Sequence, residues 1–163
     1  MGERIELHNP FNRKLLPMVR PVENKDRSIF LELAAEFWNT PAVHAKIPLA
    51  YHERTFDLIM EGTPYVSAYL ILYNEIVVGY GLLSFTYSNE TGGMVVWLEE
   101  IYIREAYRGR GLGNEYLRFV SNTYRETAAW LRLEISPENG RARELYKKHG
   151  YHPMPYHGYY KIL

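Results

Sequence analysis

The fold is decided by one segment, which reads W-L-E-E-I-Y-I-R-E-A-Y-R-G-R-G-L-G-N-E-Y-L from Trp97 to Leu117. It joins an apolar strand to a helix through a turn that carries two arginines and three glycines. Glycine lets the backbone turn tightly and approach a ligand, because it has no Cβ. The first N–H groups of the following helix lack intrahelical partners and lie at the positive end of its dipole. The sequence therefore predicts a nest for anionic oxygen, such as that of a phosphate group.

The spacing of these glycines distinguishes this turn from other glycine-rich binding motifs. Gly109, Gly111 and Gly113 give G-x-G-x-G, whereas a dinucleotide-binding turn needs G-x-G-x-x-G and an acidic residue about 20 positions later. A Walker loop needs Gly-Lys followed by Ser or Thr, which this segment lacks. An arginine-glycine segment that binds nucleic acid would normally repeat, and this one occurs once. A basic, flexible loop after a strand remains the alternative for the glycines alone.

Two blocks together resemble the GNAT superfamily of N-acetyltransferases, which use acetyl-coenzyme A. The first is Arg108-x-x-Gly111-x-Gly113, which is similar to the pyrophosphate signature of that family. The second is S-P-E-N-G-R-A-R-E-L-Y-K-K-H-G-Y, which resembles the later family motif at Asn139, Ala142, Leu145, Tyr146, Gly150 and Tyr151. The blocks occur in the family's order, separated by one helix and one strand, and the ordered pair is a stronger signal than either alone.

This resemblance covers roughly residues 94–151 and implies an α/β GNAT fold. In that fold a mixed, mostly antiparallel central sheet is flanked by helices, and two parallel strands splay apart at the acetyl-CoA cleft. The length of 163 residues suits one domain with a sizeable core. We expect a polar lead-in over residues 1–17 and a single N-acetyltransferase domain over residues 18–163.

Periodicity and turn signals predict the elements along the chain. Apolar spacing predicts helices and β-branched or aromatic runs predict strands, with Asn74-Glu75 as a hairpin turn. The expected helices are Asn24–Trp38 with Asn24 as cap, Tyr51–Met60, Leu112–Arg125 and Arg141–His149. The expected strands are Met18–Val22 at an edge, Val66–Tyr73, Ile76–Tyr87, Met94–Ile103, a short buried strand at Trp130–Ile135, and a tyrosine-rich final strand at Pro155–Leu163. The Met94 and Trp130 strands should pair in parallel through the helix between them.

Composition excludes several function classes. Nineteen basic residues balance nineteen acidic ones, so nothing favours bulk attraction to nucleic acid or to an anionic membrane. The chain has no cysteine, which excludes a thiolate nucleophile, thiolate metal sites and disulfides. His149 and His152 share no helical face, because Gly150 and Pro153 interrupt a helix there, so we expect no metal site. We expect no membrane span, no targeting segment and a cytoplasmic location.

The resemblance assigns the binding of acetyl-CoA, the expected cosubstrate, to three regions. Backbone N–H groups of the glycine-rich turn would hold the pyrophosphate, with two arginines adding charge. The main chain of the preceding strand would pair with the pantetheine arm, and the last helix would contact the cofactor as well. The cofactor-binding candidates are Ile101, Tyr102, Ile103, Arg108, Gly109, Arg110, Gly111, Leu112, Gly113, Asn139, Ala142 and Tyr146. Ile101 and Ile103 would at the same time pack their side chains in the core.

The catalytic candidates are Glu99, Glu100 and Tyr146. Adjacent residues of a regular strand face opposite sides, so one glutamate is expected in the cleft, and the resemblance favours Glu99 as general base. A bulge would reverse that choice. Tyr146, whose phenol has an ordinary pKa of ~10, would give a proton to the departing thiolate. The N–H of Ile101 would polarise the acetyl carbonyl. Solvated strand ends for the glutamates and a buried aromatic for Tyr146 are the alternatives.

The acceptor and the assembly are the least constrained features. We expect direct transfer to a primary amine of a small molecule or peptide in a ternary complex, because the chain has no cysteine to carry an acyl group. Trp38, His44 and Tyr87 are candidates for the acceptor pocket, with aromatic core as the alternative for each. A non-catalytic acetyl-CoA-binding regulatory or interaction module is the second hypothesis. Dimers are common in the family that the chain resembles, so both a monomer and a homodimer remain possible.

Overall fold

A computed structural model describes residues 18–41, 43 and 46–163 of the chain. The lead-in expected over residues 1–17 and the candidate His44 lie outside the described residues. The described elements, in chain order, are β1 (Met18–Pro21), η1 (Asn24–Asp26), α1 (Arg27–Phe37), α2 (Leu49–Met60), β2 (Val66–Tyr73), β3 (Ile76–Ser88), β4 (Gly93–Ile103), η2 (Glu105–Tyr107), α3 (Leu112–Tyr124), β5 (Trp130–Leu133) and α4 (Gly140–Lys148).

The described strands form one sheet in the order β1-β2-β3-β4-β5. Neighbours pair antiparallel except β4 and β5, which are parallel, so the predicted mixed, mostly antiparallel sheet is confirmed. The β2–β3 hairpin turns at Asn74 and Glu75, which both take positive φ angles of 53° and 67°. Two successive left-handed residues match the right-handed twist of the flanking strands, which is why this dipeptide makes so short a turn.

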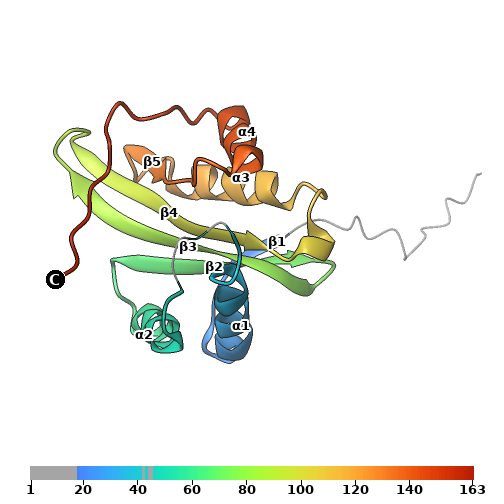
Figure 1. The fold of residues 1–163 in the computed structure, drawn as a ribbon. Helices are drawn as coiled ribbons and strands as arrows, with labels where there is room; N and C mark the ends of the chain where they lie inside the picture. The colour runs from blue at the N-terminus through green and yellow to red at the C-terminus, as the bar shows by residue number, and fades with distance from the viewer. Residues whose placement is uncertain (1–17, 42, 44–45) are drawn as a thin grey trace, which may run out of the picture.

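Helices cover both faces of the sheet, with α1 and α2 on one side and α3 and α4 on the other (Figure 1). Because strand side chains alternate between faces, neighbouring residues such as Leu70 and Ile71 enter different cores. The core under α1 and α2 is built from Phe30, Leu33, Phe56, Leu70 and Tyr80 among others, and the core under α3 from Leu83, Val96, Leu112, Leu117 and Val120 among others.

Two local predictions are wrong in detail. The N-terminal cap of the first helical segment is Glu23 and not Asn24, because Glu23 and Asp26 form a reciprocal capping box before α1. The fifth strand is not buried, since Trp130 is 40% exposed at the sheet edge.

The described part of the chain contains no helix with the length and apolar character that crossing a membrane would need.

The predicted final strand is also wrong, because residues Pro155–Leu163 form no strand. The tail leaves α4 and crosses beside the far end of the β3–β4 hairpin (Figure 1), where the Tyr156 hydroxyl donates to Glu90 at 3.2 Å. Its last aromatic residues are nearly fully exposed, at 95% for Tyr159 and 91% for Tyr160. Strand propensity is realised only when side chains pack and the backbone pairs, and the tail does neither.

Candidate active site

The candidate site is a cleft that opens where β4 and β5 part. The two strands pair from Val95 with Trp130 to Leu98 with Leu133, and the pairing ends there. At the same point the β3–β4 register shifts: Leu83 pairs with Leu98, and Leu82 pairs with Glu100. Glu99 is therefore an extra residue in β4, a β-bulge, which bends a strand and ends regular pairing.

The cleft has a volume of about 630 Å³ and lies mainly between β4, the α3 loop and α4. Its lining includes Leu98, Glu99, Ile101, Tyr102 and Ile103 from β4; Arg108, Gly109, Gly111, Leu112, Gly113 and Asn114 from the loop and the start of α3; Glu134, Ile135 and Ser136 after β5; Glu138 and Asn139 before α4; and Arg141, Ala142, Leu145 and Tyr146 from α4. The structure thus gathers nearly all the predicted site residues around one cavity.

The loop before α3 has the geometry that the glycines predict. Gly109 and Gly111 take positive φ angles of 80° and 82°, where other residues are strained. Gly111 is the N-cap of α3 and carries no side chain, so no capping group covers the first N–H groups of the helix. Gly113 has another function, because a Cβ there would lie 3.2 Å from Leu145 of α4. Its small size lets α3 and α4 approach each other beside the cleft.

The two arginines of the loop have different positions. Arg108 lines the cleft, and its Nε donates to the carbonyl of Ile103 at 2.9 Å. The guanidinium of Arg110 lies over the rings of Tyr73, at 5.2 Å, and Tyr107, at 5.7 Å, and is not part of the cleft lining. Arg108 is therefore placed to face a ligand, whereas Arg110 holds the loop against β2.

Helix α4 brings Asn139 and Tyr146 to the cleft. The side-chain oxygen of Asn139 accepts from the N–H of Ala142 at 3.1 Å and so caps the helix. Tyr146 lies about two turns later, is 8% exposed, and lines the cavity. Burial raises the pKa of the Tyr146 phenol to about 12. The phenol therefore keeps its proton at neutral pH, as a proton donor must.

The two adjacent glutamates face different surroundings. Glu99 lines the cleft and its carboxylate accepts from the Ser84 hydroxyl. Glu100 is 9% exposed on the side of α1, where Trp38 Nε1 donates to it at 2.8 Å and the Tyr80 hydroxyl donates to its other oxygen. Burial is the main cause of the raised pKa of Glu100. The bulge does not reverse the choice between the two glutamates, because Glu99 is itself the extra residue.

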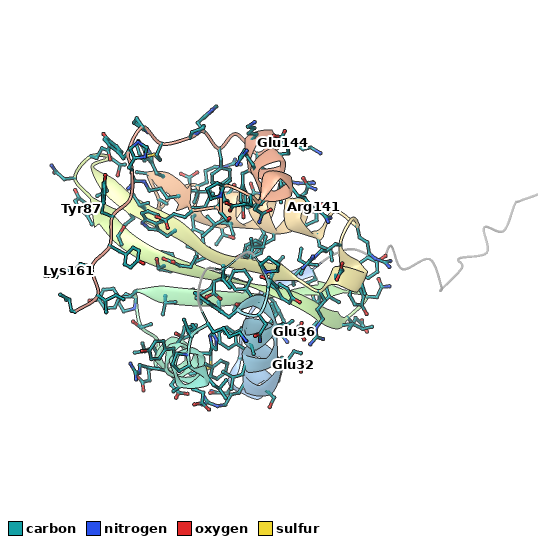
Figure 2. The ribbon with its side chains drawn as sticks, in the orientation of Figure 1. Glu32, Glu36, Tyr87, Arg141, Glu144 and Lys161 are labelled. Atoms are coloured by element: carbon teal, nitrogen blue, oxygen red, sulfur yellow. The ribbon has the colours of Figure 1, made fainter. Side chains whose placement is uncertain are left out.

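The end of α1 contributes cleft residues that sequence reasoning missed. Phe37, Thr40 and Pro41 line the cavity. The α1 helix is fixed beside the end of β4 by Arg104, which forms hydrogen bonds with Glu36, one of them at 2.8 Å, and also with Glu32. Figure 2 shows both glutamates along α1, beneath the sheet. No local pattern could have indicated this wall, because Phe37 belongs to the apolar stripe of a core helix.

The predicted acceptor-pocket residues are not brought together. Trp38 packs beside His52, with 6.3 Å between ring centroids, and is not in the cleft lining. Tyr87 is 68% exposed at the far end of β3, on the side of the molecule where Lys161 also lies (Figure 2). His44 is outside the described residues. Among the residues that the structure describes, no three His, Cys, Asp or Glu side chains come together as a metal site.

Part of the chain is similar in sequence to curated acetyltransferases. The chain is 40% identical over 75 residues to thialysine N-epsilon-acetyltransferase of Bos taurus, a match that covers 45% of this chain and 44% of that protein. The matched stretch therefore spans less than half the length of this curated relative.

Solved structures share the fold at low identity. Aminoglycoside N-acetyltransferase AAC(6')-Iy in complex with CoA superposes with a TM-score of 0.75 at 17% identity, over 93% of this chain and 97% of that chain. A ribosomal-protein-alanine N-acetyltransferase from Brucella melitensis biovar Abortus 2308 superposes with a TM-score of 0.73 at 16% identity, over 91% of this chain and 100% of that chain. The model of the acetyltransferase (GNAT) family matches residues 27–151, well over half of the sequence. This chain belongs to the acetyltransferase (GNAT) family.

Proposed function

We propose that this protein transfers the acetyl group of acetyl-CoA to a primary amine. Acetyl-CoA is the cosubstrate typical of the family, and a structural neighbour was solved with CoA. The observation that carries the proposal is the position of the cleft, which opens where β4 and β5 part and is bordered by the glycine-rich loop of residues 108–113. A phosphate nest and an open strand edge in one cavity suit a long ligand that is anionic at one end.

The described residues fit such a ligand. The N–H groups of the loop and of the first turn of α3 have no capping side chain and lie at the positive end of the helix dipole. We assign the diphosphate to these groups, with the Arg108 guanidinium adding charge. Each hydrogen bond to a charged group contributes about 1.5–3 kcal/mol, so several together suffice to anchor the cosubstrate. The pantetheine arm is assigned to the main chain of Ile101–Ile103.

The acyl transfer needs a base, an oxyanion donor and an acid, and the cleft offers one of each. Acetyl-CoA supplies the thioester when it is bound. Glu99 takes the proton that the attacking ammonium must lose, through water or directly, and the N–H of Ile101 donates to the carbonyl oxygen. As the new C–N bond forms and the C–S bond breaks, Tyr146 gives its proton to the sulfur. The nitrogen then loses its second proton, which restores the phenol of Tyr146 directly or through water. Freeing an aliphatic amine of its proton at pH 7 costs about 4 kcal/mol, which explains the need for a carboxylate.

We propose a small aliphatic amine as the acceptor. The curated relatives include a thialysine N-epsilon-acetyltransferase and a spermidine/spermine N(1)-acetyltransferase-like protein, and both names specify amine acetylation. In the cleft, the carboxylate of Glu99 would attract an ammonium group, and Phe37 and Tyr102 provide apolar surface for a methylene chain. This combination favours a flexible amine over a peptide backbone.

The test incubates the purified 163-residue protein with acetyl-CoA and a panel of thialysine, lysine, spermidine, neamine and an alanine N-terminal peptide. Thiol release and the mass of the product are both recorded. The proposal expects acetylation of at least one flexible aliphatic amine, and a loss of at least about 100-fold in kcat in the Glu99→Gln, Tyr146→Phe double variant. Peptide acetylation alone would overturn the acceptor class. Tight acetyl-CoA binding without turnover on any amine would overturn catalysis and favour a non-catalytic binding module.

A further inference from the structure

We propose that Trp38 and Tyr80 are positioning residues, which act through Glu100 to hold the bulge of β4 in its bulged register. This inference rests on the proposed acetyl transfer, because its consequence is the placement of Glu99 and Ile101 in the cleft. Neither Trp38 nor Tyr80 lines that cleft, and each donates a hydrogen bond to Glu100.

The carboxylate of Glu100 is buried. Both of its oxygens accept hydrogen bonds, one from the Trp38 indole at 2.8 Å and one from the Tyr80 phenol. Among the described residues no Lys, Arg or His forms an ion pair with it. A buried carboxylate without these donors is costly, since an unsatisfied charged group loses its full hydration. The two donors therefore decide which surroundings Glu100 can occupy.

The register of β4 changes at the bulge. Gly81 pairs with Ile101 and Leu82 with Glu100, but Leu83 pairs with Leu98. The bulge thus lets Leu98 and Ile101 both face the core under α3, while Glu100 faces α1. A one-residue slip of β4 that removed the bulge would exchange the faces beyond it, because the side-chain period of a strand is two.

In the slipped register Glu100 would face the apolar core under α3. It would lose both donors, and Glu99 would leave its place at the point where β4 and β5 part. The hydrogen bonds to Glu100 therefore oppose the slip. Loss of these hydrogen bonds would therefore displace Glu99, which we assign to proton transfer, and the N–H of Ile101, which we assign to the carbonyl oxygen.

Both donors also pack against other aromatic rings. Trp38 directly follows α1 and packs against the rings of Phe37, at 5.8 Å, and His52, at 6.3 Å. Tyr80 is fully buried and packs edge-on against Phe30 at 5.6 Å. This packing places the Trp38 indole and the Tyr80 phenol where they donate to Glu100. Since displacement of a reacting group by about 1 Å can lower a rate 100-fold, small shifts here should be measurable.

The kinetic test uses the full chain and the variants Trp38→Phe, Tyr80→Phe and the double variant. Matched controls are Trp130→Phe and Tyr87→Phe, which change exposed residues of the same types. For each Glu100-linked variant we expect kcat to fall about tenfold. The KM and Kd for acetyl-CoA should change less than kcat does, because the phosphate loop is untouched. The double variant should lose less than the product of the single losses, because both act on one carboxylate.

The second readout is hydrogen exchange of β4 followed by mass spectrometry, which does not depend on turnover. We expect faster exchange at residues 98–102 in Trp38→Phe and Tyr80→Phe but not at residues 93–97, and no change in the controls. Unchanged kcat and unchanged exchange would overturn the inference. The inference would also be overturned if the variants lost only thermal stability. It would likewise be overturned if a rise in the KM for acetyl-CoA accounted for the whole loss of activity. If the wild type acetylates no amine, the proposed function fails, and the exchange pattern alone decides on the positioning role.

Discussion

The phenol of Tyr116 in α3 occupies the space above Gly81 of β3: a Cβ at position 81 would lie 2.0 Å from the Tyr116 hydroxyl oxygen. Tyr116 is fully buried, and its hydroxyl has no hydrogen-bond partner among the described residues. The absence of a side chain at position 81 therefore lets α3 lie close to the strand that pairs with Ile101. Packing of a helix across a glycine fixes the distance between the two layers.

Gly81→Ala should destabilise the protein, because the methyl group overlaps a buried ring that cannot swing into solvent. Overpacking of this kind costs about 1–3 kcal/mol. Chemical unfolding measures it, with Gly140→Ala as the control, since a Cβ there meets nothing within 4 Å. In a Tyr116→Leu background the cost of Gly81→Ala should shrink by more than half. Equal costs in both backgrounds would show that Tyr116 is not the obstacle.

Gly111→Ala should weaken acetyl-CoA binding. The residue has a φ of 82°, and a left-handed conformation costs a residue with a side chain about 1–2 kcal/mol. A Cβ there meets nothing within 4 Å, so the effect should come from backbone strain alone. We expect the loop to relax and the Kd for acetyl-CoA, measured by calorimetry, to rise about tenfold. Gly92→Ala, with a φ of 65° in a distant turn, should lose similar stability and leave the Kd unchanged.

Tyr146→Phe should lower kcat far more than it weakens acetyl-CoA binding. Loss of a general acid lowers a rate by about 100-fold or more. Burial raises the pKa of the Tyr146 phenol to about 12, so the phenol should stay protonated through the whole assay range. The wild-type kcat should therefore show no decline near pH 10 caused by ionisation of Tyr146. The measurement is a kcat–pH profile of both proteins at saturating substrates. A wild-type inflection near pH 10 that the variant lacks would contradict the buried phenol.

Glu36→Gln should reduce stability at neutral pH but not in acid. Hydrogen bonding to Arg104 is the main cause of the lowered pKa of Glu36. A lowered folded-state pKa gives stability that is present above the ordinary value of 4.5 and is lost as the pH falls through the folded value. We expect a difference of about 1 kcal/mol at pH 7 that vanishes as the pH drops well below 4.5. Glu61→Gln, at the exposed end of α2, is the control. If the difference in free energy of unfolding between the two proteins grew as the pH fell, the ion pair with Arg104 would not be its cause.

Elements with a local signal could be predicted from the sequence. The Asn74-Glu75 turn, the apolar stripe of α3 and the glycines before it depend on backbone preferences that neighbouring residues set. The parallel pairing of β4 with β5 followed from the helix between them. These features are local because φ angles and side-chain periods are properties of short segments.

Features that depend on distant partners could not be predicted. The bulge at Glu99 and the orientation of Glu100 depend on Trp38, which is 62 positions away in the sequence. The tail was expected to be a strand because tyrosine and isoleucine favour strands, but its backbone has no partner strand in the described residues. The cleft wall at Phe37 depends on how α1 lies against the sheet, and one of the contacts that hold it there joins Arg104 to Glu36, 68 positions apart.

The site proposed for the diphosphate of the coenzyme is formed by the amides before and within the first turn of α3. A crystal structure of the full chain grown with CoA tests it most directly. We predict diphosphate oxygens within hydrogen-bond distance of the N–H groups between Gly109 and Gly113, beside the Arg108 guanidinium. A diphosphate bound elsewhere on the protein, or no bound coenzyme at millimolar concentration, would contradict the claim and the site built on it.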